Sequence, residues 1–138
     1  MIKTYNWEVI EKLKFEALRS DIRRSRLLLH DSRENQIQQM LIVIHQSSKI
    51  DMHRHPKYKS ESYHIIEGRM RVNYWDAEHG NFFTSDYSVE KNYDTSLFGR
   101  HNNGIWHMPY SLTEWTVYLE TYDGPFVKEK DVEFIVQH

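Results

Sequence analysis

After one amphipathic segment near its start, the chain is a succession of short stretches with strand character. Candidate strands cover residues 36–46, 60–68, 69–81, 86–91, 104–109, 115–122 and 132–137. Turn signals rich in Gly, Asn and Asp separate them at 67–69, 78–81, 102–104 and 122–125. Many short strands at spacings of roughly 8–12 residues are typical of a β-sandwich or β-barrel. The sequence therefore predicts an all-β domain.

The segment 7–20 has the spacing of an amphipathic helix. Ile10, Leu13 and Ala17 recur at helical intervals, and neither Pro nor Gly interrupts them. We expect this helix to cover a sheet or a barrel end. The 138 residues suit a single core and contain no repeat, low-complexity tract or linker. We therefore expect a single domain over 1–138, with a helical N-terminal segment at 1–30 and a β-barrel at 36–138.

Composition and charge exclude several classes of function. The net charge is −2, with acidic and basic residues interspersed, which argues against binding to nucleic acid. The start lacks the apolar core of a signal peptide, and no run approaches 18 apolar residues, so we expect a soluble cytoplasmic protein with no membrane partner. There is no cysteine. Any metal must therefore be held by histidine and carboxylate groups.

Four residues in two separate segments have the chemistry of a metal site. His53 and His55 are two residues apart, and on a strand such side chains point to the same face. Glu61 opens the next strand, and His107 lies in a later strand after a glycine-containing turn. Three neutral imidazoles and one carboxylate suit a divalent ion such as Fe, Mn, Zn, Ni or Cu.

The same residues resemble the two-part pattern of the cupin superfamily, which is H-x-H, a nearby Glu, a Gly after that strand and a later G-x-x-H. This chain has His53-x-His55, then Glu61 and Gly68, and later Gly104-x-x-His107. The gap between His55 and Glu61 is one residue longer than the usual cupin spacing. The Pro before the second glycine and the Asn after the last histidine are absent.

A closer resemblance, over most of the chain, is to the WbuC family of cupin-fold metalloproteins, which are often encoded among genes for surface-polysaccharide synthesis. The matching pieces are RRSRLLLH (23–30), QQMLIVI (38–44), HRHPKYKSESYHIIEGRMRV (53–72), IWHMPY (105–110), LETYDGPF (119–126) and DVEFI (131–135). The resemblance implies an all-β cupin-type barrel (a double-stranded β-helix or jelly roll) with an N-terminal helix. It also implies one metal ion held by His53, His55, Glu61 and His107. It implies little about the reaction.

Further side chains are candidates for the surroundings of the metal. Strand alternation from Glu61 points Tyr63 inward and His64 outward, unless a bulge reverses the order. Together with His101, which precedes His107 in a loop, these two residues are the acid–base candidates. The aromatic candidates for the wall of a sugar-sized pocket are Tyr74, Trp106 and Tyr118. Lys57 and Lys59 are candidates for contact with an anionic ligand at its rim. Glu120 lies two residues after Tyr118 on the same strand and is a candidate to face the pocket.

Two main classes of function remain open. The first is a metal-dependent enzyme, such as an isomerase, epimerase or dioxygenase, acting on a sugar or nucleotide-sugar intermediate of surface-polysaccharide synthesis. The second is a non-catalytic module that binds or senses a sugar or another small molecule through the metal. A metal-free sugar epimerase on the same barrel is a third alternative. Barrels of this class often pair through edge strands, so we expect a homodimer.

Overall fold

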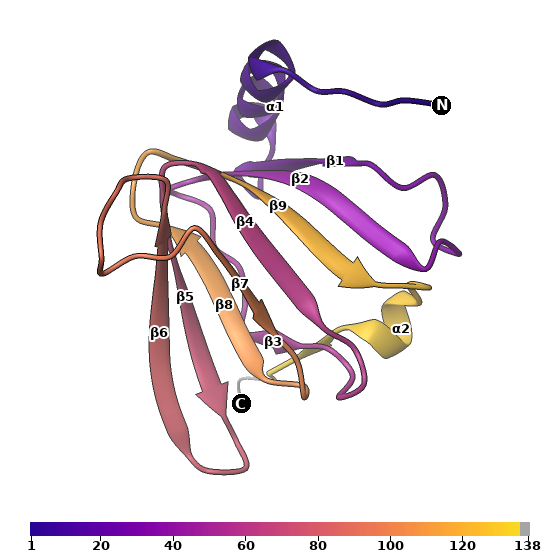
Figure 1. The fold of residues 1–138 in the computed structure, drawn as a ribbon, viewed down its shortest axis with the longest axis vertical. Helices are drawn as coiled ribbons and strands as arrows, with labels where there is room; N and C mark the ends of the chain where they lie inside the picture. The colour runs from indigo at the N-terminus through magenta and orange to yellow at the C-terminus, as the bar shows by residue number, and fades with distance from the viewer. Residues whose placement is uncertain (136–138) are drawn as a thin grey trace.

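Ten antiparallel strands form two sheets in the computed structural model, which describes residues 1–135 (Figure 1). The first sheet has the order β1-β2-β9-β4-β7, with β1 (Arg24–Leu28), β2 (Ile37–His45), β9 (Trp115–Asp123), β4 (Glu61–Glu67) and β7 (Phe98–His101). The second sheet has the order β10-β3-β8-β5-β6, with β10 (Glu133–Phe134), β3 (His53–Arg54), β8 (Trp106–Ser111), β5 (Arg69–Asp76) and β6 (Asn81–Ser88). The predicted all-β class is confirmed.

The main hydrophobic core lies between the two sheets. On β5, Met70, Val72 and Tyr74 are buried while the residues between them are partly exposed, which is the alternation of a strand with one face on a core. Burial of each such apolar side chain contributes about 1.5–3 kcal/mol. The other buried members come from both sheets: Ile42, Ile44, Tyr63, Ile65, Tyr87 and Tyr118.

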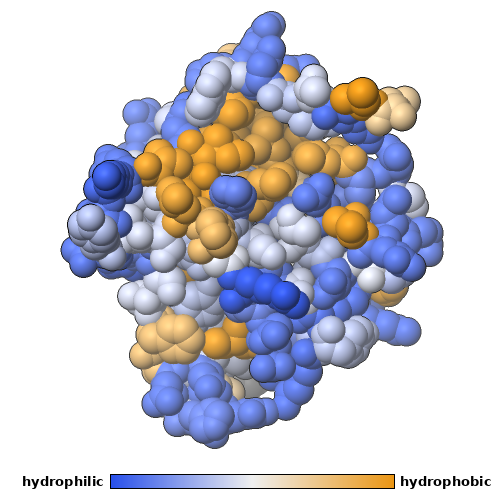
Figure 2. All heavy atoms as spheres, viewed as in Figure 1, coloured by the Kyte–Doolittle hydropathy of each residue, from blue (hydrophilic) through white to orange (hydrophobic). Residues whose placement is uncertain are grey.

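The helix α1 (Trp7–Arg19) covers the outer face of the first sheet at one end (Figure 1). Asn6 caps its N-terminus, because the side-chain oxygen accepts a hydrogen bond of 3.2 Å from the backbone N–H of Val9. The helix buries the three residues predicted from spacing, Ile10, Leu13 and Ala17. Figure 2 shows hydrophobic residues gathered beside this helix over β2, β9 and β4. No helix within residues 1–135 is long and apolar enough to cross a membrane.

Some predicted boundaries differ from the structure. The helical segment expected at 1–30 ends at Arg19, and residues 24–28 form β1 because they pair with β2 along their whole length. The strand expected at 86–91 begins earlier and ends at Ser88, because β6 pairs with β5 from the turn onward. The strand expected at 132–137 is formed at Glu133–Phe134, and its last two residues lie outside the described part of the chain. Strand β7 was not predicted.

Candidate metal centre

The three histidines predicted as metal ligands come together on neighbouring strands. His53 on β3 lies in register with His107 on β8, and His55 follows directly after β3. The ring centroids are 4.2 Å apart for His53 and His107, 5.0 Å for His55 and His107, and 5.4 Å for His53 and His55. One nitrogen from each ring lies within 4.8 Å of the other two. A single ion can therefore contact all three rings.

Backbone carbonyl groups orient each of these rings through its Nδ1 atom. The Nδ1 to oxygen distances are 2.8 Å from His53 to Asp51, 2.8 Å from His55 to Asp131 and 3.0 Å from His107 to Ile105. A carbonyl oxygen only accepts a hydrogen bond, so Nδ1 carries the hydrogen in each ring. In the neutral ring Nε2 then presents a lone pair. This is the tautomer and the outer support that a metal-ligating histidine uses.

Glu61 brings a carboxylate to the same point from β4 of the opposite sheet. Its side chain is 3% exposed, and Oε2 lies 3.1 Å from Nε2 of His55 and 3.0 Å from Nε2 of His107. The Nε2 atom of His107 is buried and makes no hydrogen bond to any described residue. If the rings of His55 and His107 are neutral, the lone pairs of their Nε2 atoms face the lone pairs of Glu61 Oε2 at these distances. A cation between them, either a proton or a metal ion, removes that repulsion.

The donor set fits a divalent metal ion. Burial alone would lower the pKa of His55, but its contact with Glu61 raises it, and a bound ion would replace the proton that these two groups share. Burial, helped by the neighbouring His107, lowers the pKa of His53 to about 4, so this ring is neutral at physiological pH. Burial alone would raise the pKa of Glu61, but a hydrogen bond from Glu120 and the surrounding histidine rings hold it well below its ordinary value. Three imidazole nitrogens and one ionised carboxylate suit Fe, Mn, Zn or Ni alike.

His101 belongs to the same cluster, although it was expected in a loop. It ends β7 in register with Glu61, and its Nε2 atom lies 3.0 Å from Oε2 of Glu61. Glu61, His101 and His107 form a second set of donors within 4.8 Å of one another. Burial lowers the pKa of His101, so the ring is neutral and able to accept a proton.

Tyr63 lies beneath this group, as strand alternation predicts. The phenol is 1% exposed and donates a hydrogen bond of 3.1 Å to Oε2 of Glu61, while the Nε2 atom of His101 is 3.3 Å from its oxygen. Burial raises the pKa of Tyr63 well above its ordinary value. Tyr63 therefore stays protonated and acts as a hydrogen-bond donor.

Glu120 is a second carboxyl group at the cluster. It lies on β9 in register with Tyr63, so its side chain points to the same interior face. Burial and the charge of Glu61 raise the pKa of Glu120 well above its ordinary value. A protonated Glu120 beside an ionised Glu61 gives one shared hydrogen bond in place of two repelling charges.

The C-terminal segment supports His55 from outside the cluster. The Asp131 carboxylate, at the end of helix α2 (Lys128–Asp131), is buried and accepts hydrogen bonds from Lys59 Nζ and from Tyr122 Oη, the latter at 2.6 Å. The backbone oxygen of Asp131 is the acceptor for His55 Nδ1. The buried Lys59–Asp131 ion pair therefore holds the carbonyl group that orients a predicted metal ligand.

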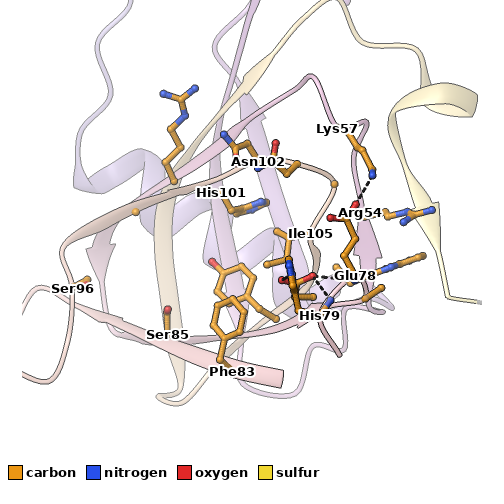
Figure 3. A pocket seen from close by; sticks show the side chains of 18 of the residues that line it. Arg54, Lys57, Glu78, His79, Phe83, Ser85, Ser96, His101, Asn102 and Ile105 are labelled. Atoms are coloured by element: carbon orange, nitrogen blue, oxygen red, sulfur yellow. Dashed lines mark hydrogen bonds and ion pairs between the residues drawn. The ribbon is translucent and has the colours of Figure 1, made fainter. Parts of the chain in front are cut away.

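Two cavities open toward the cluster. The larger, of about 640 Å³, has His101 in its lining (Figure 3). Aromatic side chains form part of its wall, with Tyr74 and Phe83 stacked at 5.1 Å between ring centroids, and Trp106 beneath the guanidinium of Arg54. The Lys57–Glu78 ion pair lies at its edge (Figure 3).

The smaller cavity, of about 390 Å³, reaches the cluster from the side of β1 and β2. Its lining includes the predicted ligands His53, His55 and Glu61, together with Glu120. Basic residues also line it: Arg24, Arg26, Arg33 and Lys49.

The remaining predicted residues lie outside the histidine and glutamate cluster, and some of them line the larger cavity. The structure does not bring His64 to the cluster, because its exposed side chain faces away from Glu61 and packs against Phe98 at 5.6 Å between rings. Tyr118 is buried in the core and lines neither cavity. Lys59 is buried in its ion pair with Asp131 and is therefore not available at a rim. Lys57, Tyr74 and Trp106 do line the larger cavity.

Comparison with solved structures supports the fold. Protein SO0799 from Shewanella oneidensis matches with a TM-score of 0.68 and 9% identity, over 80% of this chain and 72% of that one. An oxalate oxidase in complex with glycolate matches at 0.63 and 8% identity, over 84% of this chain and 57% of the other. Oxalate decarboxylase from Bacillus subtilis, with Mn(II) centres, matches at 0.57 and 18% identity, over 73% and 24%.

These similarities confirm a cupin-type β-barrel with an N-terminal helix. The histidine and glutamate cluster in that fold makes the chain a candidate metal-binding protein. The chain spans only about a quarter of the oxalate decarboxylase chain and just over half of the oxalate oxidase chain. At these identities the likeness extends to the fold alone.

Sequence comparison identifies a family through one family model. Among curated proteins none matches this chain. One family model matches residues 5–85, which include His53, His55 and Glu61 and exclude His101 and His107. Membership of the WbuC family is not confirmed. Because the match covers more than half of the 138 residues, the chain belongs to the family described as "Domain of unknown function (DUF6016)".

Proposed function

We propose that this protein is a metal-dependent enzyme that acts on a small molecule. The observation that carries the proposal is the convergence of three histidine rings and the Glu61 carboxylate at a point between two cavities. A divalent ion there would be held by His53, His55, His107 and Glu61. Bound in this way, it would supply Lewis acidity toward a carbonyl or hydroxyl oxygen of the ligand.

The chain's own groups supply the proton chemistry in this proposal. His101 lines the larger cavity and is neutral, so it can accept a proton from a ligand held there. Tyr63 Oη, 3.3 Å from His101 Nε2, keeps its proton and helps to hold that ring in place. An isomerisation or epimerisation needs such a base, whereas a dioxygenation does not.

The ligand in this proposal is a sugar or nucleotide-sugar intermediate of surface-polysaccharide synthesis in the cytoplasm. Two features support it: the resemblance to WbuC sequences and the aromatic wall that Tyr74 and Trp106 give to the larger cavity. Aromatic faces with polar neighbours suit a ligand that has both apolar and hydroxyl-bearing surfaces. The alternative is a module that binds the same ligand without converting it.

Turnover by the metal-loaded protein tests the proposal. The protein would be incubated with nucleotide sugars, sugar phosphates and small organic acids, while NMR follows the products and an electrode follows O₂. We expect conversion of at least one compound, reduced at least 100-fold in His107→Ala and retained in His64→Ala, which changes an exposed histidine outside the cluster. Binding without conversion by the metal-loaded protein would contradict the enzyme proposal and favour the binding module.

A further inference from the structure

Two arginines of the edge strand β1 lie on its inner face, where Arg24 is half-buried and Arg26 is exposed at the edge of the smaller cavity. Arg24 and Arg26 lie in register with Ile44 and Ile42, two buried residues of the main core. Ser25, between them, faces the other way and bonds to helix α1. Because side chains alternate along a strand, both arginine side chains leave β1 on the face that carries the core residues. There they line the smaller cavity.

The hydrogen-bond contacts of both arginines within the described residues are with neutral groups. Arg24 donates to Ser48 Oγ at 3.3 Å and to the backbone oxygen of Lys49 at 3.0 Å, and Arg26 contacts Met40 Sδ at 3.6 Å. Among residues 1–135 neither forms an ion pair, whereas three other arginines do: Arg54, Arg69 and Arg71. Burial, together with the charge of the neighbouring Arg26, lowers the pKa of Arg24.

The balance of charge around the smaller cavity is positive. Arg33 and Lys49 join the two arginines in its lining. The carboxylates that face them are Asp51, Glu61 and Glu120. Glu61 is surrounded by histidines, and among residues 1–135 neither Glu61 nor Glu120 forms an ion pair with an arginine. Four basic side chains therefore stand against three carboxylates in the lining.

We infer that the smaller cavity binds a small anion, whose carboxylate or phosphate group is held by Arg24 and Arg26 while its other end reaches the histidine cluster. Guanidinium groups bind both kinds of oxyanion through paired hydrogen bonds. A volume of about 390 Å³ accommodates an organic acid or a sugar phosphate. The inference rests on the proposed metal centre and adds an anionic ligand that reaches it from the smaller cavity, distinct from the ligand held in the larger one.

Isothermal titration calorimetry on the full chain loaded with metal tests this inference. The probes are oxalate, succinate, inorganic phosphate and glucose 1-phosphate, with glucose as the neutral comparison. Arg26→Gln removes an exposed guanidinium at the cavity, and Arg100→Gln is the matched control because Arg100 is also exposed and lines the larger cavity. We expect at least one anion to bind, with its affinity reduced about tenfold or more in Arg26→Gln and unchanged in Arg100→Gln.

Other results would overturn the inference. Binding that weakens in Arg100→Gln but not in Arg26→Gln would place the anion in the larger cavity, and binding of glucose alone would exclude an anion site. Absence of binding by every anion would refute it as well. Metal content measured on the same samples separates the two proposals: metal-loaded protein that binds no anion refutes only this inference, whereas a chain that retains no metal refutes the proposed centre. The carboxylate and phosphate probes identify which oxyanion is preferred.

Discussion

Substitution of Asp131 tests whether the C-terminal segment stabilises both the fold and the metal centre. Its carboxylate is 3% exposed and accepts hydrogen bonds from three donors: Lys59 Nζ, Tyr122 Oη and the backbone N–H of Val127. Asp131→Asn keeps the size of the side chain and removes the charge. The Lys59 ammonium, itself 8% exposed, is then left without an ionic partner.

The expected loss follows from the burial of this ion pair. Removing one partner of a buried pair costs about 3–5 kcal/mol, because the other charge stays desolvated. The oxygen of the substituted amide still accepts a hydrogen bond, so we expect a loss of about 3 kcal/mol, at the lower end of that range. In a chain of this length that corresponds to a fall in Tm of roughly 10 °C. Displacement of the carbonyl group that orients His55 should also weaken metal binding by about 10–100-fold.

Urea unfolding of Asp131→Asn, Lys59→Met and the double variant measures the coupling. Lys59→Met removes the charge that Asp131→Asn leaves unpaired, so the double variant should lose less stability than the sum of the single losses, by about 1 kcal/mol or more. Titration with metal provides the second measurement. A loss below about 1 kcal/mol in Asp131→Asn, or additive single losses, would refute the reasoning.

Three further predictions concern pH, two glycine turns and assembly. Burial alone would raise the pKa of Asp131, but Lys59 and the other hydrogen-bond donors hold it below its ordinary value. The Lys59–Asp131 pair therefore stabilises the fold fully above about pH 4, and this stabilisation is lost as the pH falls through the lowered pKa. Acid should thus destabilise the unsubstituted chain more steeply than Asp131→Asn, and parallel stability curves would contradict this. Gly68→Ala should prevent stable folding, because its φ is +79° and the added Cβ would lie 1.9 Å from the Trp115 carbonyl oxygen. Gly80→Ala has a similar φ of +68° in open space and should cost only about 1–2 kcal/mol in urea unfolding, so equal effects would be contrary to expectation. Light scattering should give twice the chain mass of 16.8 kDa, and the mass of one chain would disprove the expected homodimer.

Local patterns in the sequence predicted much of the fold. The helical spacing of Ile10, Leu13 and Ala17 identified the buried face of α1, because that face is set by the 3.6-residue period alone. Strand parity likewise placed Tyr63 inward and His64 outward from Glu61. Strand β7 was missed because FGRH carries no alternation, and its structure depends on pairing with β4.

The candidate site was predictable only where its residues share a motif. His53, His55, Glu61 and His107 carry recognisable spacing, and the structure brings them together. The position of His101 beside Glu61 follows from the register of β7 with β4, which the sequence does not show. Strand parity indicated that Glu120 on β9 faces the pocket, but not that it lies beside Glu61. The support of His55 by Asp131 depends on a segment 76 residues further along the chain, and no short-range pattern encodes such a contact.

Metal content is the most direct test of the central claim that His53, His55, Glu61 and His107 form a metal centre. The full chain would be purified without chelator or affinity nickel and examined by elemental analysis. We expect about one Fe, Mn, Zn or Ni ion per chain, lost in His53→Ala and in His107→Ala and retained in His64→Ala. A chain without metal, whose Tm is unchanged by added Fe, Mn, Zn or Ni, would contradict the claim.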